Sequence, residues 1–330
     1  MKNVLVTGGT GFLGNNVVRE LLNAGFKVRV AIRSASSRKP FVGLAVDIIE
    51  VDFQDPDSIR NAVRKIDTVI HVAGLIWFGW EKLGECRKVN VDVTRLLAEE
   101  CLARQVRLVH VSSIDALPVG DRGQVLDEES TGNSKPQCNY VVSKCEADQV
   151  LKKLRGQGLE LVIVHPGLMF GPWDWRPSSG ELIQALSRMG SWFVCPTGGT
   201  SVCDVRDVAR GILRAASAEK AGRDYILAGQ NLSYRELCHR IAKKLNVGRC
   251  WLRTGPLVYL LVSVAGKLSG WFGKEHVVNT GTLQMGRLWH HYSSERARTE
   301  LAYQVRDIDE TLEDAVDWLA EQNMIRQPQP

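Results

Sequence analysis

The sequence predicts an α/β protein with a doubly wound parallel sheet and a smaller lobe formed by the C-terminal half. Three observations support this fold class. Short apolar runs alternate with amphipathic helical patterns, a glycine-rich turn follows the first apolar run, and the alternation loosens after Pro166. Strands that alternate with helices are typical of a parallel sheet covered by helices on both faces.

The predicted elements follow from apolar runs and turn residues, taken in chain order. Buried strands are predicted at 3–9, 27–33, 47–53, 67–74, 107–113 and 159–167. Helices are predicted between them: one from the glycines to Gly25, a short one at 58–66, a long one at 88–105 and one containing Tyr140. A later helix at 233–246 begins with a capping box formed by Ser233 and Glu236.

The pattern divides the chain into two parts. Residues 1–166 are expected to form the sheet domain, joined by returning segments near 203–230, and residues 167–330 mainly the lobe. The segment 255–273 has apolar residues at helical spacing but is too short and too interrupted to span a bilayer. We interpret it as a helix that covers the core or a pocket, with weak contact to a membrane surface as the alternative.

Composition limits the classes of protein to which the chain can belong. With 330 residues, 44% of them hydrophobic and 24% charged, it has the composition of a globular protein with a large core. The net charge of +5 is not concentrated in the basic stripe that nucleic-acid binding requires. The eight cysteines include no CxxC pair and no zinc spacing, so no metal centre is expected. Because "MKNVLVTGG" leaves no room for a signal peptide, a cytoplasmic location is expected.

The stretch "GTGFLG" is a candidate anion-binding turn. Its glycines fit G-x-G-x-x-G from Gly9 and a second, longer spacing from Gly8. The motif follows a predicted strand and opens a predicted helix, which is the context that dinucleotide binding requires. Backbone N–H groups of such a turn bind a pyrophosphate at the helix N-terminus. The sheet domain is therefore predicted to be of the Rossmann type, with the cofactor phosphates beside Gly8, Gly11, Phe12, Leu13 and Gly14.

The end of the second predicted strand indicates which dinucleotide is bound. NAD-binding proteins carry a ribose-reading acid near this position, but here Arg33 follows the strand, and every charged residue of 27–39 is basic. An arginine can pair bidentately with the 2′-phosphate of NADP and stack on adenine. We therefore predict NADP, held by Arg33, with NAD as the alternative. Asp52 and Phe53 are candidates for the adenine edge.

The motifs "TGGTGFLG", "HVAG", "VNVDVT", "VSSID", "YVVSK" and "HPGLMFGP" together resemble the extended short-chain dehydrogenase/reductase (NAD-dependent epimerase/dehydratase) family. The nearest likeness is to its dihydroflavonol 4-reductase-like and 3β-hydroxysteroid dehydrogenase-like branch. The resemblance implies an NAD(P)-dependent oxidoreductase with Tyr140 as catalytic acid/base, Lys144 as its partner and Ser113 as the third member. Physical chemistry agrees with these roles. Tyr140 and Lys144 are four residues apart and would share a helix face, and a nearby ammonium favours a phenolate. Strand alternation would turn Ser112 to the opposite face.

The resemblance also assigns roles to further residues. Ala73 and Gly74 of "HVAG" are expected beside the cofactor, and Pro166 and Gly167 beside its nicotinamide carboxamide. Asn90 matches a family asparagine that braces the active-site helix, with a place on the helix surface as the alternative. The remaining motif residues, interpreted as mainly structural, are His71, His165 and Asp207.

The chemistry implied by the resemblance is hydride transfer between NADP(H) and a hydroxyl or ketone carbon. Aromatic clusters at 77–80, 173–175 and 192–193 favour a hydrophobic small-molecule substrate, such as a dihydroflavonol, steroid or lipid. Two alternatives stay open: an NAD-dependent nucleotide-sugar epimerase or dehydratase, and a non-catalytic NAD(P)-sensing protein. A homodimer formed through the 88–105 and Tyr140 helices is an expectation from the family alone.

Overall fold

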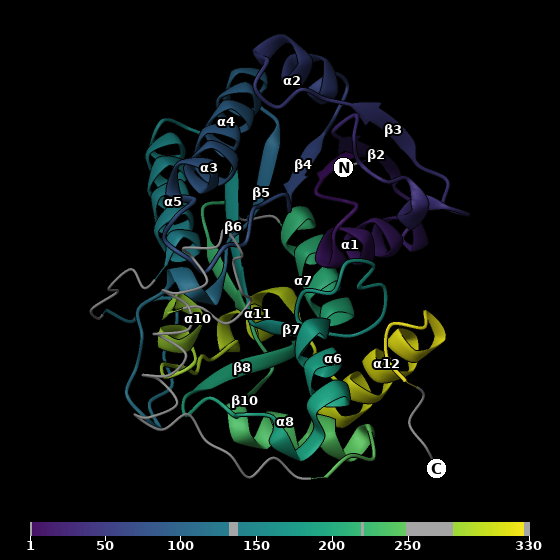
Figure 1. Ribbon diagram of the computed structural model, residues 1–330. Helices are drawn as coiled ribbons and strands as arrows, with labels where there is room; N and C mark the ends of the chain where they lie inside the picture. Colours follow the sequence, from purple (N-terminus) through teal and green to yellow (C-terminus); the bar gives the residue numbers. More distant parts are fainter. Residues whose placement is uncertain (1, 132–137, 219–220, 249–279, 327–330) are drawn as a thin grey trace.

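The computed structural model describes residues 2–131, 138–218, 221–248 and 280–326 (Figure 1). The chain forms a seven-stranded sheet and a second, four-stranded sheet. The segment 255–273, interpreted above as a covering helix, lies outside the described residues. Within the described ranges, no helix is long and apolar enough to cross a membrane.

The large sheet is parallel throughout and confirms the predicted fold class. Its strand order is β3-β2-β1-β4-β5-β6-β9. The order reverses between β1 and β4, so a crevice opens at the carboxyl ends of these two strands, where open α/β sheets bind ligands. The strands are β1 (Asn3–Thr7), β2 (Lys27–Ile32), β3 (Asp47–Glu50), β4 (Thr68–His71), β5 (Arg107–Val111), β6 (Leu161–Pro166) and β9 (Asp224–Leu227).

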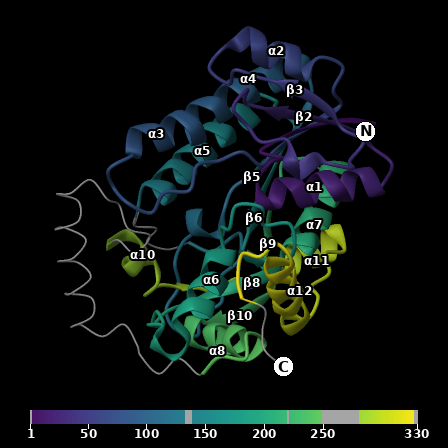
Figure 2. The same ribbon diagram turned by 45° about the vertical axis from the view of Figure 1, so that its right-hand side comes forward.

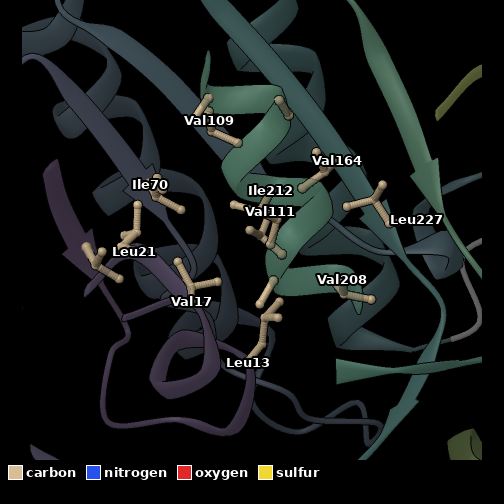
Figure 3. Packing of buried hydrophobic residues seen from close by; sticks show 14 of the residues in the cluster. Leu13, Val17, Leu21, Ile70, Val109, Val111, Val164, Val208, Ile212 and Leu227 are labelled. Atoms are coloured by element: carbon tan, nitrogen blue, oxygen red, sulfur yellow. The ribbon is translucent and has the colours of Figure 1, made fainter. Parts of the chain in front are cut away.

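Alternate strand side chains pack on opposite faces of this sheet. On one face, Ile70, Val109 and Val164 pack against α1 and α7 (Figure 3). On the other face, Val69 and Leu108 pack against α2, α4 and α5. The covering helices are α1 (Phe12–Asn23), α2 (Pro56–Val63), α4 (Val93–Arg104), α5 (Asn139–Gly156) and α7 (Val205–Ser217).

The second sheet is built around β8 (Gly199–Asp204) and forms the lobe (Figure 2). β10 pairs with β8 antiparallel, whereas β7 and β11 pair with it in parallel. Three helices pack on this sheet around a separate apolar core. These elements are β7 (Leu168–Phe170), β10 (Gln230–Ser233), β11 (Trp289–His290), α6 (Gly180–Met189), α8 (Tyr234–Lys244) and α12 (Ile308–Glu321).

The chain returns to the large sheet after it has entered the lobe. α7 and β9 lie within the predicted returning segment near 203–230, and both pack in the core of the large sheet. A second return is α11 (Glu295–Leu301), whose Ala297 and Leu301 join that same core. The structure therefore adds α11 to the sheet domain, a contribution that the sequence pattern did not reveal.

Helix boundaries agree with the predictions in one case and differ in another. The Ser233 capping box is present, since Ser233 Oγ accepts from the Glu236 N–H at 3.2 Å and Glu236 Oε2 accepts from the Ser233 N–H at 2.9 Å. The helix predicted at 88–105 instead begins with α3 (Leu83–Arg87) and passes through a π-helical turn over Lys88–Asp92 before α4. The predicted strands extend up to three residues beyond the observed strands at their carboxyl ends, where the chain leaves the sheet and forms the site.

Candidate active site

The glycine turn between β1 and α1 fits a dinucleotide phosphate. Gly8 has a φ of +71°, and a Cβ there would lie 2.6 Å from the Ala73 nitrogen. A Cβ on Gly14 would lie 2.1 Å from the Gly8 carbonyl oxygen. α1 begins after Gly11 with no side-chain cap and no acidic residue in its first turn. Its first N–H groups, beginning with that of Phe12, thus lack a side-chain acceptor, as an anion site requires.

Arg33 follows the last residue of β2, close to the switch point of the sheet. Its side chain is exposed and makes no ion pair or hydrogen bond with the part of the chain that the structure describes. The basic segment around it is partly neutralised, because Arg29 pairs with Asp47 and Arg38 pairs with Glu50. Arg33 is therefore the arginine of this segment whose guanidinium is available to a ligand.

The predicted adenine-side residues have different surroundings. Asp52 is exposed, and its Oδ1 accepts a hydrogen bond from the Gln54 N–H at 2.9 Å. Phe53 is half-buried and packs against the apolar core under α2. Both lie just beyond the carboxyl end of β3, next to β2 in the sheet.

The three predicted catalytic residues come together at the carboxyl end of β5. Ser113 follows the strand, and Tyr140 and Lys144 lie one turn apart on α5. Ser113 is a hydrogen-bonding neighbour of Tyr140 and lowers the pKa of its phenol. Lys144 Nζ donates to the Val111 carbonyl at 2.8 Å and lies 3.4 Å from where a Cβ on Gly74 would stand. This arrangement places Lys144 between the tyrosine and the loop after β4.

Strand alternation separates the two adjacent serines. Ser112 Oγ donates to Asp148 Oδ2 of α5 at 2.8 Å, in a buried contact. Ser113 Oγ instead accepts the Asp115 N–H at 3.1 Å and meets Tyr140. Of the two, only Ser113 can therefore reach an oxygen that Tyr140 also contacts.

Burial shifts the pKa values of both residues of the Tyr–Lys pair. It raises the pKa of Tyr140 well above its usual value, with a further increase from the Asp115 carboxylate and an opposing effect of the Ser113 hydrogen bond. It lowers the pKa of Lys144 to about 8, against the opposing charge of Asp148. Tyr140 is thus a protonated donor in the structure, and Lys144 titrates near neutral pH.

Asn90 braces the active-site helix, as the resemblance implied. Its Nδ2 donates to the Leu75 carbonyl and to Ser143 Oγ, both at 2.9 Å, and its Oδ1 accepts from the Leu75 N–H at 2.7 Å. Asn90 is 1% exposed. The alternative of an asparagine on the helix surface is wrong, because this side chain joins the loop after β4 to α5.

The motif residues interpreted as structural have structural contacts. His71 is fully buried between the hydroxyls of Thr7 and Thr94, and burial lowers its pKa to about 3. His165 Nδ1 lies 3.1 Å from the Ser113 carbonyl oxygen, below the site. Of the predicted cofactor neighbours, Pro166 ends β6 and Gly167 follows it. The backbone meets β8 at this point, since a Cβ on Gly167 would lie 2.5 Å from the Ser201 carbonyl oxygen.

The aromatic clusters differ in their surroundings, and Phe193 shares the lobe core with Trp173 and Trp175. Phe78 meets Tyr140 edge-on, with ring centroids 5.7 Å apart. Trp173 and Trp175 pack against Trp318 of α12 in the lobe core and do not contact Tyr140. Trp192 is 77% exposed. Only the first cluster is therefore placed to form the wall of a substrate pocket.

Sequence reasoning missed Asp115, which acts on Tyr140, and its contact with His290. Asp115 follows Ser113 by two positions, and its Oδ1 lies 3.6 Å from Nδ1 of His290 on β11. The Asp115 carboxylate also raises the pKa of Tyr234 at the start of α8, after the larger effect of burial. Asp115 was visible in the motif "VSSID", but nothing in the pattern connects it with a histidine of the lobe.

Comparison with known proteins gives consistent matches over the chain. Residues 4–228 match the model of the "NAD dependent epimerase/dehydratase family". A Synechocystis protein named "Putative dihydroflavonol 4-reductase" is 31% identical, covering 97% of this chain and 95% of its own. "Sterol demethylase protein B" of Methylococcus capsulatus is 30% identical, covering 97% of this chain and 99% of its own. The crystal structure of gox2253 is similar with a TM-score of 0.85 at 28% identity, covering 99% of this chain and 100% of that chain.

Proposed function

Because the chain belongs to the NAD-dependent epimerase/dehydratase family, we propose that it is an NADP-dependent reductase or dehydrogenase that interconverts a ketone and an alcohol on a hydrophobic substrate. The grouping of Ser113, Tyr140 and the buried Lys144 at the carboxyl end of β5 is the observation that supports this proposal most directly. Relatives named for a dihydroflavonol and for sterols agree with an apolar ring substrate.

Ser113 and Tyr140 bind the substrate oxygen and move its proton. In the reduction, Ser113 Oγ donates a hydrogen bond to the carbonyl oxygen, and Tyr140 transfers its phenolic proton to the same oxygen. A nicotinamide cofactor, when bound, would supply the hydride for the carbonyl carbon. The Lys144 ammonium stabilises the phenolate that remains on Tyr140. In the oxidation, this phenolate takes the carbinol proton back.

An apolar wall beside Tyr140 supports the hydrophobic substrate class. Tyr140 lies in a cluster with Cys138, Val141 and Met285, and Phe78 and Leu288 pack against it. Met285 ends α10 (Thr280–Met285), so the lobe and the sheet domain both contribute to this wall. Apolar area removed from water contributes about 25 cal/mol per Å² to binding, which favours a ring or chain over a charged sugar nucleotide at this wall.

The catalytic role of Tyr140 is tested with Tyr140→Phe. General acid catalysis contributes about 10²- to 10⁴-fold, so kcat/KM for ketone reduction with NADPH should fall at least about 100-fold. Tyr225→Phe on β9, which removes a hydroxyl that donates to Glu300 of α11, is the matched control and should retain activity. Turnover by Tyr140→Phe at the wild-type rate would contradict the mechanism.

The choice of NADP is tested by titrating nucleotide-free protein with NADPH and NADH while tryptophan fluorescence is followed. The wild type should bind NADPH more tightly. Arg33→Ala should lower the NADPH-to-NADH affinity ratio about 10- to 100-fold, the range expected for charge-assisted hydrogen bonds. Arg95→Ala, an exposed arginine on α4 paired with Glu99, is the control. NAD that copurifies and resists exchange would favour the epimerase alternative instead.

A further inference from the structure

A surface hollow of about 260 Å³ lies between α1 and the loop that follows β7. Its lining includes Arg19, Glu20 and Leu22 of α1, Leu44 before β3, Trp173 after β7 and Arg206 of α7. It contains no residue of the glycine turn or of the catalytic triad. Arg19 lies seven residues after Phe12, about 10 Å along the helix axis at 1.5 Å per residue. The hollow is therefore separate from the position predicted for the cofactor phosphates.

Arg19 brings an uncompensated positive charge to this hollow. Its Nε donates to Asn15 Oδ1 at 3.0 Å, and its Cζ lies 3.5 Å from the centroid of the Trp173 ring. The two Nη groups have no hydrogen bond or ion pair with the part of the chain that the structure describes. Partial burial lowers the pKa of Arg19, and no described carboxylate opposes this shift. A stacked guanidinium is held in one plane, so its two Nη groups form a fixed fork for a ligand.

The backbone that holds the Trp173 ring against Arg19 is strained. Trp173 has a φ of +74°, a left-handed conformation that bulky side chains rarely adopt. Such a conformation costs about 1–3 kcal/mol, and residues of this kind gather at ligand-binding positions. The same loop is tied to α1 by Asn16, whose Nδ2 donates to the Pro172 carbonyl at 3.1 Å. The Trp173 ring and the Arg19 guanidinium thus form a fixed wall of the hollow.

The other charged side chains of the lining have partners within the protein. Arg206 pairs with Asp204 and with Asp314, so its charge is balanced by two carboxylates. Glu20 Oε1 lies 4.0 Å from Arg210 Nε, which partly balances the charge of this carboxylate. The charge that a ligand in the hollow would meet is therefore mainly that of Arg19.

The lining also defines the chemistry of the ligand. A carboxylate fits the free fork of Arg19, because its two oxygens can accept two parallel N–H bonds from one guanidinium. Leu22 and Leu44 favour an apolar group on the rest of the ligand. The Glu20 carboxylate repels a doubly charged phosphate more strongly than a singly charged carboxylate. We propose that this hollow binds a small monocarboxylate with a short apolar chain, at a site separate from the catalytic and cofactor sites.

Hexanoate and hexanamide test this proposal, because they have the same chain and differ in the charge of the head group. Isothermal titration of the wild type should show one bound hexanoate and at least about tenfold weaker binding of hexanamide, the difference expected for hydrogen bonds to a charged group. Hexanoate binding should persist at saturating NADPH, because the glycine turn is not part of the hollow.

Variants of Arg19 assign the binding to the hollow. Arg19→Gln removes the guanidinium and should weaken hexanoate binding about 10- to 100-fold. Arg19→Lys keeps the charge but loses the planar fork, so its affinity should lie between those of the wild type and Arg19→Gln. Arg95→Gln changes an exposed arginine of α4 that pairs with Glu99, and it is the matched control. Tyr140→Phe changes the catalytic site and should bind hexanoate as the wild type does.

The outcomes distinguish this site from the other places where a carboxylate could bind. Weaker hexanoate binding in Arg19→Gln, with wild-type affinity in Arg95→Gln and Tyr140→Phe, supports the proposal. Absence of hexanoate binding, equal affinity in Arg19→Gln, loss of binding in Tyr140→Phe or displacement by NADPH overturns it. Inorganic phosphate that binds more tightly than hexanoate and depends on Arg19 would overturn the carboxylate class. Ketone reduction is not a readout here, so none of these results decides the proposed function.

Discussion

Lys144 is the residue whose titration should be visible in the kinetics. Its buried ammonium has a pKa lowered to about 8, whereas the pKa of Tyr140 is raised. In the reduction the proton donor therefore stays protonated, while the charge that stabilises the resulting phenolate is lost as pH rises through about 8. We expect kcat/KM for reduction to be level below this pH and to fall above it.

Asp148→Asn should move the fall of kcat/KM at alkaline pH, called the alkaline limb below, to lower pH. The Asp148 carboxylate lies one turn after Lys144 and raises the lysine pKa against the effect of burial. Without that charge the ammonium loses its proton at lower pH. The measurement is a pH profile of kcat/KM for both proteins. Glu146→Gln, on the same helix but paired with Arg87, is the control and should leave the limb in place. A limb that moves to higher pH in Asp148→Asn would contradict this account.

Single residues differ in how well the sequence predicts their surroundings. The neighbourhood of Ser113, Tyr140 and Lys144 was predictable because helix and strand periodicity decide which side chains share a face. The pairing of Asp115 with His290 was not, because it joins residues that are 175 positions apart. The same holds for Trp173 and Trp175, which belong to the lobe core through Trp318.

At the scale of elements, the sequence predicts the central residues of strands and helices better than it predicts where these elements end. Apolar runs identified each of the first six strands, but the predicted strands include the residues that leave the sheet to form the site. The long helix predicted at 88–105 contains a π-helical turn at Lys88–Asp92. There the Asn90 side chain bonds to Leu75 and Ser143, and the backbone carbonyl of Asn90 accepts from Thr94 Oγ1 at 2.7 Å. The bonds to Leu75 and Ser143 are tertiary contacts, and hydrophobic periodicity contains no information about them.

At the scale of the molecule, the sheet domain and the lobe are joined by repeated crossings of the chain. After β6 the chain enters the lobe, returns through α7 and β9, enters again, and returns once more through α11 before α12 (Figures 1 and 2). A catalytic site formed from both parts depends on these crossings. From the lobe, Met285 packs with Tyr140 and His290 lies near Asp115. We therefore expect the two parts to unfold together.

Asp207 on α7 is the side chain that tests this coupling. It is 4% exposed and accepts from the Arg306 N–H at 2.8 Å, from Arg306 Nε at 3.1 Å and from Arg210 at 2.9 Å. Arg306 lies two residues before the start of α12, so these bonds join the large sheet to the lobe. Asp207→Ala removes the acceptor of the Arg306 N–H and leaves Arg306 and Arg210 with only their longer contacts to Asp204 and Glu20, and it should lower the free energy of unfolding by about 3 kcal/mol.

The measurement is urea unfolding followed by circular dichroism and by tryptophan fluorescence, which reports on the lobe through Trp173, Trp175 and Trp318. If the two parts are coupled, both signals move to lower urea together and their midpoints coincide in the variant as in the wild type. Asp317→Ala, an exposed acid on α12, should leave the midpoint unchanged. A fluorescence transition that separates from the circular dichroism transition in Asp207→Ala would mean that the lobe folds independently.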